Sequence, residues 1–208
     1  GNSMTFNTWD YNLAEFSTDS AINSKAWFTK VPNDTVVEEQ SWVISPCFDL
    51  RGVEKPMISL DIFRNMEDNE GVVLRYTIDN EQNRQNVGSS LNQGINWFNE
   101  VITDKPDGQD IGWSGSQTGD EWIKAIRYLD ELKDKPNVRF KLHYGSQHVK
   151  DLDSKGFAFD NFKISSRTRM VLLENFTNGS NGGVIVSDND VNALYSKNFS
   201  DVVKLEYH

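Results

Sequence analysis

The sequence is poor in the residues that most directly mark a chemical function. Cys47 is the only cysteine in the chain, which excludes an intrachain disulfide and a metal cluster held by thiolates. The three histidines are His143, His148 and His208, and none belongs to a His-Glu-x-x-His zinc motif. P-loop and Gly-x-Ser-x-Gly motifs are also missing. We therefore expect no catalytic activity, although the paired carboxylates of a glycosidase can come from distant strands.

Basic residues and long apolar stretches are scarce as well. The 21 Lys and Arg residues stand against 31 Asp and Glu residues, which gives a formal net charge of −10. Such a charge disfavours a nucleic-acid backbone or an anionic membrane surface as partner, and it favours neutral glycans, proteins or divalent cations. No apolar run approaches the roughly 18 residues of a membrane span. The chain opens without a signal peptide, but Gly1–Met4 is typical of a cloning remnant, so export stays compatible with the sequence.

The residues that are present suit a globular core. Hydrophobic residues make up 37% of the chain and charged residues 25%, which is typical of a folded protein. Six Trp and twelve Phe supply large side chains for burial. A chain of 208 residues accommodates one large domain, or one domain and a fragment.

Three stretches alternate apolar and polar residues. Their apolar positions are Ile58, Leu60 and Ile62, then Val72, Leu74, Tyr76 and Ile78, then Val138, Phe140, Leu142 and Tyr144. Period-two alternation with one wet face is typical of antiparallel strands in a sandwich. Arg139, Lys141 and His143 lie opposite the third set, so we expect His143 to be solvated. The pattern predicts an all-β fold with two antiparallel sheets.

Other segments leave more than one interpretation open. Pro46 cannot donate a ladder hydrogen bond, so the strand that contains it is an edge strand or is broken there. Residues 79–121 form a long polar region that is functional or contains short strands. Residues 122–129 fit a helix stripe, yet their all-β surroundings favour a strand that runs into a turn at 130–136.

The stretch 155–164 alternates aromatic residues around an Asp-Asn pair. Phe157 and Phe159 share one face of an extended strand, whereas Phe162 and Ile164 share the other. Such a strand is covered on both sides or carries a bulge that resets its phase. Asp160 then lies among apolar side chains and needs backbone amides, a cation or a metal.

The last forty or so residues change character. Residues 170–176 and 202–207 predict strands, and residues 187–198 have helical spacing. A β-α-β order belongs to a parallel unit. We therefore expect two domains, a sandwich over 1–166 and a C-terminal βαβ-like segment over 167–208.

An ordered set of short motifs is spread over about residues 23–166. The set comprises Ser41-Trp42-Val43, Ser45-Pro46-Cys47-Phe48-Asp49-Leu50, Gly94-Ile95-Asn96-Trp97-Phe98, Gly112-Trp113-Ser114-Gly115, Trp122, Leu129-Asp130, Val138-Arg139-Phe140 and Gly156-Phe157-Ala158-Phe159-Asp160-Asn161. It resembles the MAM-like jelly-roll modules of exported Bacteroidetes proteins, which are relatives of concanavalin A-like sandwiches. The resemblance implies a jelly-roll sandwich that is secreted or displayed on the cell surface as one module of a longer protein. Tripeptides at 19–21 and 34–36 resemble the O-glycosylation sites of such proteins.

The C-terminal segment has a resemblance of its own. Residues 171–178 resemble the start of a thioredoxin-like domain, in which a Cys-x-x-Cys pair follows. The matching positions are Asn181 and Val184, and without a thiolate no disulfide exchange is expected. A single βαβ unit is also too little for that fold, so the segment is part of a longer domain or an addition to the sandwich.

The jelly-roll resemblance implies a structural Ca²⁺. Its acidic ligand in the last strand would be Asp160, with Glu39 and Asp49 (or Glu38) as further ligands. Ca²⁺ takes six to eight oxygens, so Asp160 needs such company. The alternative is that Asp160 accepts backbone N–H groups at a bulge.

Trp97, Phe98 and Trp113 lie in polar, glycine-rich stretches and are the candidates for ligand binding. An aromatic face in a loop can stack on a sugar ring. The alternative is that these rings plug the ends of the sandwich. We predict a non-catalytic binding, adhesion or scaffolding module whose partners are a glycan, a surface protein or other domains of its parent chain. The alternatives are a carbohydrate-binding module that uses these aromatics, and a glycoside hydrolase.

Overall fold

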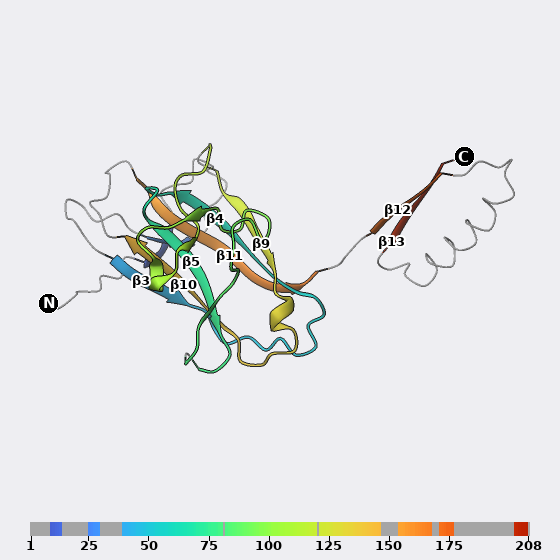
Figure 1. Cartoon of the computed structure of the whole chain (residues 1–208), viewed down its shortest axis with the longest axis horizontal. Coiled ribbons are helices and arrows are strands. Elements are labelled where there is room, and N and C mark those ends of the chain that lie inside the picture. Colours follow the sequence, from blue (N-terminus) through green and yellow to red (C-terminus); the bar gives the residue numbers. More distant parts are fainter. Residues whose placement is uncertain are drawn as a thin grey trace, which may run out of the picture. The chain divides into compact units, whose positions relative to one another are not determined.

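Two compact units, Gly1–Ser166 and Arg167–His208, make up the chain. The computed structural model describes residues 9–13, 25–29, 39–80, 82–119, 121–146, 154–167, 171–176 and 202–207. Within these ranges the first unit contains β-strands and two short 3-10 turns, and the second contains two strands (Figure 1). No helix in the described ranges is long and apolar enough to cross a membrane. The fold is all-β, as predicted.

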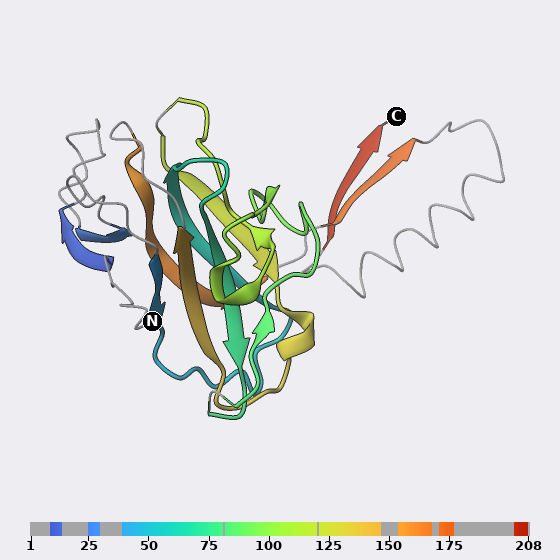
Figure 2. The same ribbon diagram turned by 60° about the vertical axis from the view of Figure 1, so that its left-hand side comes forward.

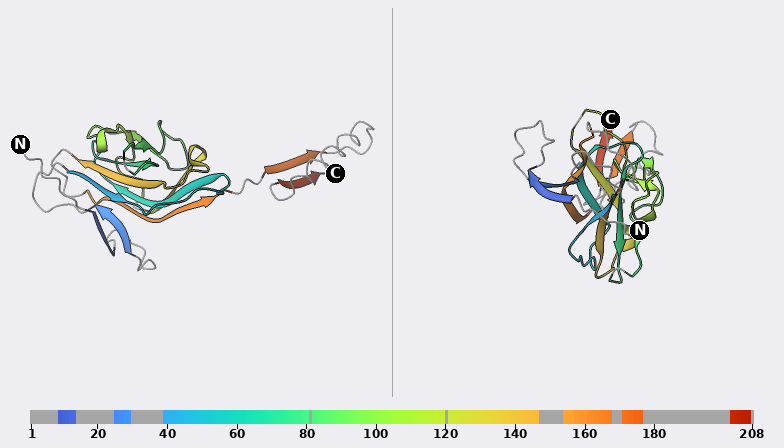
Figure 3. Two further views of the ribbon diagram at one scale, coloured as in Figure 1. Left: turned by 90° about the horizontal axis from the view of Figure 1, so that it is seen from below. Right: turned by 90° about the vertical axis from the view of Figure 1, so that its left-hand side faces the viewer.

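Two antiparallel sheets build the first unit. The larger sheet has the strand order β1-β2-β11-β4-β9, and the smaller sheet has the order β3-β10-β5-β6. The bounds are β1 Trp9–Leu13, β2 Lys25–Thr29, β3 Glu39–Ile44, β4 Pro56–Asn65, β5 Gly71–Thr77, β6 Gln85–Asn86, β9 Ile123–Tyr128, β10 Arg139–Ser146 and β11 Gly156–Ser166. The two sheets face each other across a shared apolar core (Figure 3). This arrangement is the predicted two-sheet sandwich.

The three alternating stretches form the inner faces of central strands. Ile58, Leu60 and Ile62 of β4 are fully buried, and the apolar positions of β5 and β10 belong to the same core. Burying one such side chain contributes about 1.5–3 kcal/mol. Ile78 lies beyond the end of β5 and is 43% exposed, so the strand predicted from the alternation was one residue too long at its C-terminal end.

A bulge in β11 explains its unusual pattern. The pairing of β11 with β4 shifts between Asp160 and Lys163, and Asn161 adopts a φ of 51°. Asn tolerates this left-handed conformation better than most residues. The bulge resets the alternation, so that Phe162 and Ile164 pack against the same core as the aromatic residues before it. The bulge interpretation is therefore the correct one.

Two ambiguous segments are strands that end where expected. Residues 123–128 form β9, and a 3-10 turn, η2 (Asp130–Leu132), follows directly. β3 ends at Ile44, before Pro46, and is the edge strand of the smaller sheet. A proline is tolerated here because the open side of an edge strand has no neighbouring strand that needs a hydrogen bond from the N–H that proline lacks.

The long polar region contains short elements that lie against the smaller sheet. These are β6, β7 (Glu100–Val101), the 3-10 turn η1 (Pro106–Gly108) and β8 (Ile111–Gly112). The loop with η1 and β8 contacts β5 and β10 (Figure 2). A Cβ on Gly71 would lie 2.3 Å from Ile102 Cδ1, and one on Gly145 would lie 3.0 Å from Pro106 Cγ. Glycine at both positions lets the loop approach the sheet closely.

The second unit contains a parallel pair of strands. β12 (Val171–Phe176) pairs with β13 (Val202–Tyr207) in register from end to end. Parallel neighbours need a long crossover between them, which agrees with the predicted βαβ-like order. The predicted helix at 187–198 and the positions that match the Cys-x-x-Cys pair lie outside the described residues. The thioredoxin-like resemblance stays a prediction.

Candidate functional site

One face of the smaller sheet carries an exposed tryptophan among polar side chains. The outer face is defined here as the side of β3, β10 and β5 that points away from the core. Its members include Gln40, Trp42, Ile44, Arg75, Arg139, Lys141 and His143. The alternate residues of the same strands, such as Val43, Leu74 and Leu142, pack into or against the core, which fixes this assignment. Trp42 is 43% exposed.

Two neighbours on β10 hold the Trp42 ring in place. Lys141 Nζ lies 4.1 Å from the ring centroid, within the range of a cation–π interaction. The imidazole of His143, which is directly opposite Trp42 in the strand pairing, has its centroid 5.9 Å away. The indole is thus fixed by its surroundings while nearly half of it remains open to a ligand.

Asp107 of η1 connects the loop to the outer face. Its carboxylate pairs with Arg75 and lies 3.7 Å from Arg84 Nη1 and 3.4 Å from His143 Nε2. Its backbone N–H donates to Gln40 Oε1 at 3.0 Å. Asp107 therefore joins the loop to β3, β5 and β10.

His143 is not solvated, contrary to the sequence prediction. It lies on the predicted side of β10 but is only 3% exposed, because Trp42 and the loop with Asp107 cover it. Burial lowers the pKa of His143 to about 3, against the opposing attraction of Asp107. The imidazole is consequently neutral at pH 7.

A second candidate place is an apolar groove of about 340 Å³ between the two sheets. Trp27, Phe159 and Phe162 line it from the larger sheet, and Phe48 and Ser45 belong to its other wall. The Ser45 hydroxyl donates to the Pro46 carbonyl at 2.7 Å and accepts the Phe140 N–H at 2.9 Å. Since this polar side chain is already engaged, the groove suits an apolar group better than a sugar.

A third hollow of about 300 Å³ lies at the β9 edge of the larger sheet. Ile95 and Tyr128 on its border are 59% and 55% exposed. Arg127 Nη1 donates to the Gln93 carbonyl at 2.8 Å, and Nη2 lies 3.8 Å from Glu131. The Arg127 guanidinium already contacts these groups of the protein, so it has fewer N–H donors left for a ligand.

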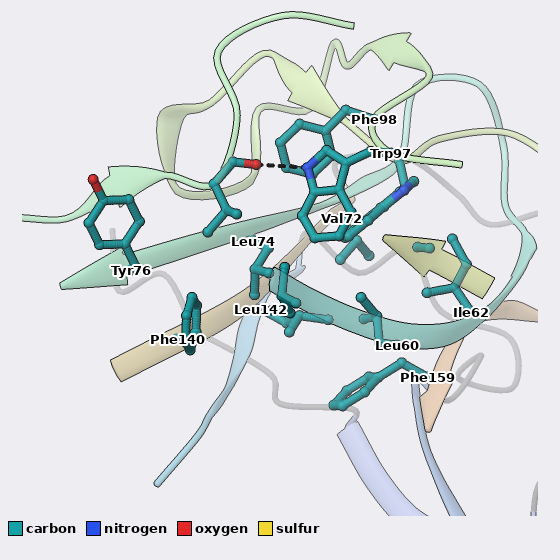
Figure 4. Close-up of a cluster of buried hydrophobic side chains, with 14 of the residues drawn as sticks. Leu60, Ile62, Val72, Leu74, Tyr76, Trp97, Phe98, Phe140, Leu142 and Phe159 are labelled. Atoms are coloured by element: carbon teal, nitrogen blue, oxygen red, sulfur yellow. Dashed lines mark hydrogen bonds between the residues drawn. The ribbon is translucent and has the colours of Figure 1, made fainter. Parts of the chain in front are cut away.

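The three loop aromatics predicted to bind a ligand lie in the core. Trp97, Phe98 and Trp113 are at most 1% exposed, and their ring centroids are 4.9–5.5 Å apart. Trp97 Nε1 donates to the Val87 carbonyl at 2.7 Å (Figure 4), and Trp113 Nε1 donates to the Asn96 carbonyl at 2.9 Å. Their faces are not available for a sugar. The alternative interpretation, in which they plug the sandwich, describes their position.

The three carboxylates predicted to hold Ca²⁺ are not brought together. Asp160 is half-exposed and lies opposite Asp61 in the larger sheet, so it does not lie among large apolar side chains as expected. Glu39 is buried in β3 of the smaller sheet. Asp49 forms a 2.6 Å ion pair with Arg51, which lowers the pKa of Asp49 to about 2.

Within the described ranges, no group of three or more His, Cys, Asp or Glu side chains is placed to hold a metal. Glu38 lies outside those ranges. The calcium site stays a prediction of the resemblance.

Sequence reasoning missed a buried polar cluster at the end of β3 and β10. Glu39 and Glu70 are 0% and 1% exposed, and Ser146 Oγ donates to Glu70 Oε1 at 2.9 Å. Burial, together with both carboxylates, raises the pKa of Tyr144. The alternation of β3 carried a signal for this cluster, because Glu39 is in phase with the inward-facing Val43.

The comparisons with known proteins leave the function to be argued from this geometry. No protein-family model matches the chain, and no curated protein matches it. Among solved structures, CBM27-1 of Caldicellulosiruptor saccharolyticus, in complex with mannohexaose, is similar with a TM-score of 0.37 and 12% sequence identity. The match covers 80% of this chain and 86% of that chain. At this distance we draw no conclusion from the likeness.

Proposed function

We propose that the sandwich is a non-catalytic binding module and that the outer face of its smaller sheet binds a glycan. The observation that carries this proposal is the position of Trp42, a half-exposed indole fixed by Lys141 and His143. Fixing the ring before binding reduces the entropy that ordering it would otherwise cost. The module is exported or displayed on a cell surface and belongs to a longer protein.

A glycan fits this face better than an apolar ligand does. An aromatic ring offers an apolar surface to a sugar ring, and neighbouring polar groups fix the orientation of its hydroxyls. Arg139 is exposed on the same face as Trp42, whereas the loop engages both amide atoms of Gln40 and Lys141 is 6% exposed. The groove between the sheets provides aromatic surface, and its Ser45 hydroxyl is engaged by the Pro46 carbonyl and the Phe140 N–H.

Binding without catalysis agrees with the polar groups around Trp42. The Asp107 carboxylate is engaged by Arg75, Arg84 and His143. In the described part of the chain, no serine or cysteine hydrogen bonds to His143. Neither group is placed as the acid or the nucleophile of a hydrolase. Release of reducing ends from any polysaccharide would contradict this part of the proposal.

Affinity electrophoresis through gels that contain single polysaccharides tests the binding. We expect at least one glycan to retard the wild-type protein, and we expect Trp42→Ala to abolish the retardation. Tyr128→Ala is the matched control, since Tyr128 is also an exposed aromatic but lies on β9 of the larger sheet. The proposal fails if no glycan retards the protein, or if Trp42→Ala migrates like the wild type.

A further inference from the structure

The edge strands of the two sheets differ in how well they are protected. β6 is only two residues long, β9 carries Lys124 and Arg127, and β1 carries Asp10. The open side of β9 is also paired, because Ile95 and Ile126 exchange backbone hydrogen bonds of 2.9 Å. Short edges, charged side chains and covering segments are the usual means by which proteins prevent unwanted strand pairing.

The remaining edge strand, β3, has little of this protection. It is six residues long, and residues 40–48 contain no charged side chain. Glu39 at its start is buried, so its carboxylate does not guard the open side. Pro46 lies beyond the end of the strand and limits pairing only there. Among the described edges, β3 is therefore the best suited to accept another strand.

The backbone groups of Trp42 and Ile44 point away from β10. The Ser45 N–H donates to the Phe140 carbonyl at 2.9 Å, and in an antiparallel ladder hydrogen-bonded pairs alternate with pairs that share no such bond. Trp42 and Ile44 belong to the second kind in this register, so their N–H and C=O groups face the open side. In the part of the chain that the structure describes, no further strand pairs with that side.

The apolar groove between the sheets lies beside the same edge. Val43 and Ile44 line it from β3, and Trp27 and Phe162 line it from the larger sheet. Because side chains alternate along a strand, a strand added to β3 would direct every second side chain toward this groove of about 340 Å³. The other side chains would lie beside the exposed Trp42 and Ile44, where apolar cross-strand contacts are favourable.

The charges of the protein indicate which kind of segment can pair here. No described residue that lines the groove is charged, and burying a charged side chain without a partner is costly. A second copy of the chain would bring a net charge of −10 against the same charge, which opposes association. A short segment without charge meets neither obstacle.

We propose that β3 binds an extended, uncharged peptide segment as an added strand. Its backbone hydrogen bonds with Trp42 and Ile44, and one of its apolar side chains enters the groove. In this mode of recognition the backbone hydrogen bonds supply affinity, and the pocket selects the side chain. The surface is separate from the proposed glycan contact, because it uses the backbone edge and the groove rather than the face of the indole.

Fluorescence anisotropy with labelled probe peptides and the full chain tests the proposal. The probes have the sequence Thr-X-Thr-X-Thr-X-Thr, in which X is Leu, Phe or Lys. A fourth probe is the Leu peptide with an N-methyl group on each Thr, which removes the N–H groups that would face β3 when the Leu side chains face the groove. We expect the Leu and Phe probes to bind saturably, and the Lys and N-methylated probes to bind about tenfold more weakly or not at all.

Substitutions at Ile44 locate the contact on the protein. Ile44→Pro removes the outward N–H without removing a hydrogen bond to β10, and it should weaken binding of the Leu probe by about tenfold. Ile44→Ala is the matched control, since it removes the apolar side chain but keeps the N–H, and it should weaken binding less. If Ile44→Pro does not fold, the N-methylated probe decides the same point.

Four results would overturn the inference. They are no binding of any probe, binding of the Lys probe as tight as that of the Leu probe, binding of the N-methylated probe equal to that of the Leu probe, and equal binding by the folded Ile44→Pro and Ile44→Ala variants. A wild-type dimer in analytical ultracentrifugation that Ile44→Pro abolishes, together with no probe binding, would assign the edge to a second copy instead. The glycan proposal is judged separately, by the electrophoretic retardation of Trp42→Ala.

Discussion

Replacing Trp113 with alanine distinguishes a core residue from a ligand-binding one. The ring is 1% exposed and packs against Trp97, Phe98 and Phe157 with centroid separations of 4.9, 4.9 and 5.9 Å. Truncating a buried tryptophan to alanine costs about 3–5 kcal/mol. This is a large part of the roughly 5–15 kcal/mol by which a domain is stable. A binding residue on an exposed loop would change stability far less.

Urea unfolding followed by tryptophan fluorescence measures the effect. All six tryptophans precede residue 167, so the signal reports on the first unit alone. With a slope of about 2 kcal/mol per molar urea, the midpoint of Trp113→Ala should fall by about 2 M. If that variant does not fold, Trp113→Phe keeps most of the volume and should lose about 1–2 kcal/mol.

The exposed Trp42 provides the control for that experiment. Trp42→Ala should lower the midpoint by much less than Trp113→Ala does, because nearly half of the Trp42 ring is already in water. A Trp113→Ala midpoint close to that of the wild type would refute the assignment of the loop aromatics to the core.

Three further substitutions test other parts of the structure. Burial lowers the pKa of His143 from 6.5 to about 3, so the unfolded chain takes up this proton more readily and the folding stability should fall as the pH drops from about 6.5 toward 3. In urea melts over that pH range, His143→Gln should lose less stability than the wild type. Equal losses would contradict the burial of His143. Gly156→Ala should lower the melting temperature, since Gly156 has a φ of 88° and a Cβ there would lie 2.5 Å from Thr29 Oγ1. The backbone conformation alone gives a penalty of about 1–2 kcal/mol. An unchanged melting temperature would contradict this conformation at the start of β11. Asp160→Asn should change the melting temperature in EDTA no more than the wild type does, because Asp160, Glu39 and Asp49 lie in separate elements. If EDTA lowers the melting temperature of the wild type but not that of the variant, Asp160 is a metal ligand.

The strands could be predicted because their signal is local. Alternation along β4, β5 and β10 reports directly which side chains face the core, and the core positions of these strands are buried as expected. Pro46 marked the end of β3 through its missing N–H. The bulge in β11 was one of two interpretations, and only the pairing with β4 decides between them.

The site could not be predicted because its parts are distant in the sequence. His143 is covered by Trp42 of another strand and by Asp107 of a loop, and a polar residue on an alternating strand gives no sign of such a cover. The same limit applies to Trp97 and Trp113, whose polar neighbours in the sequence suggested exposure. Their burial depends on how the loop folds back onto β5, which no local pattern encodes.

The position of the ligand on the sandwich is the central claim, and a nuclear magnetic resonance titration with a soluble oligosaccharide of the glycan that retards the protein tests it most directly. We expect the indole N–H signal of Trp42 and the backbone signals of Arg139 and Lys141 to shift, while the indole signals of Trp97 and Trp113 stay in place. Shifts that gather at Trp27 in the groove between the sheets, with Trp42 unmoved, would contradict the account.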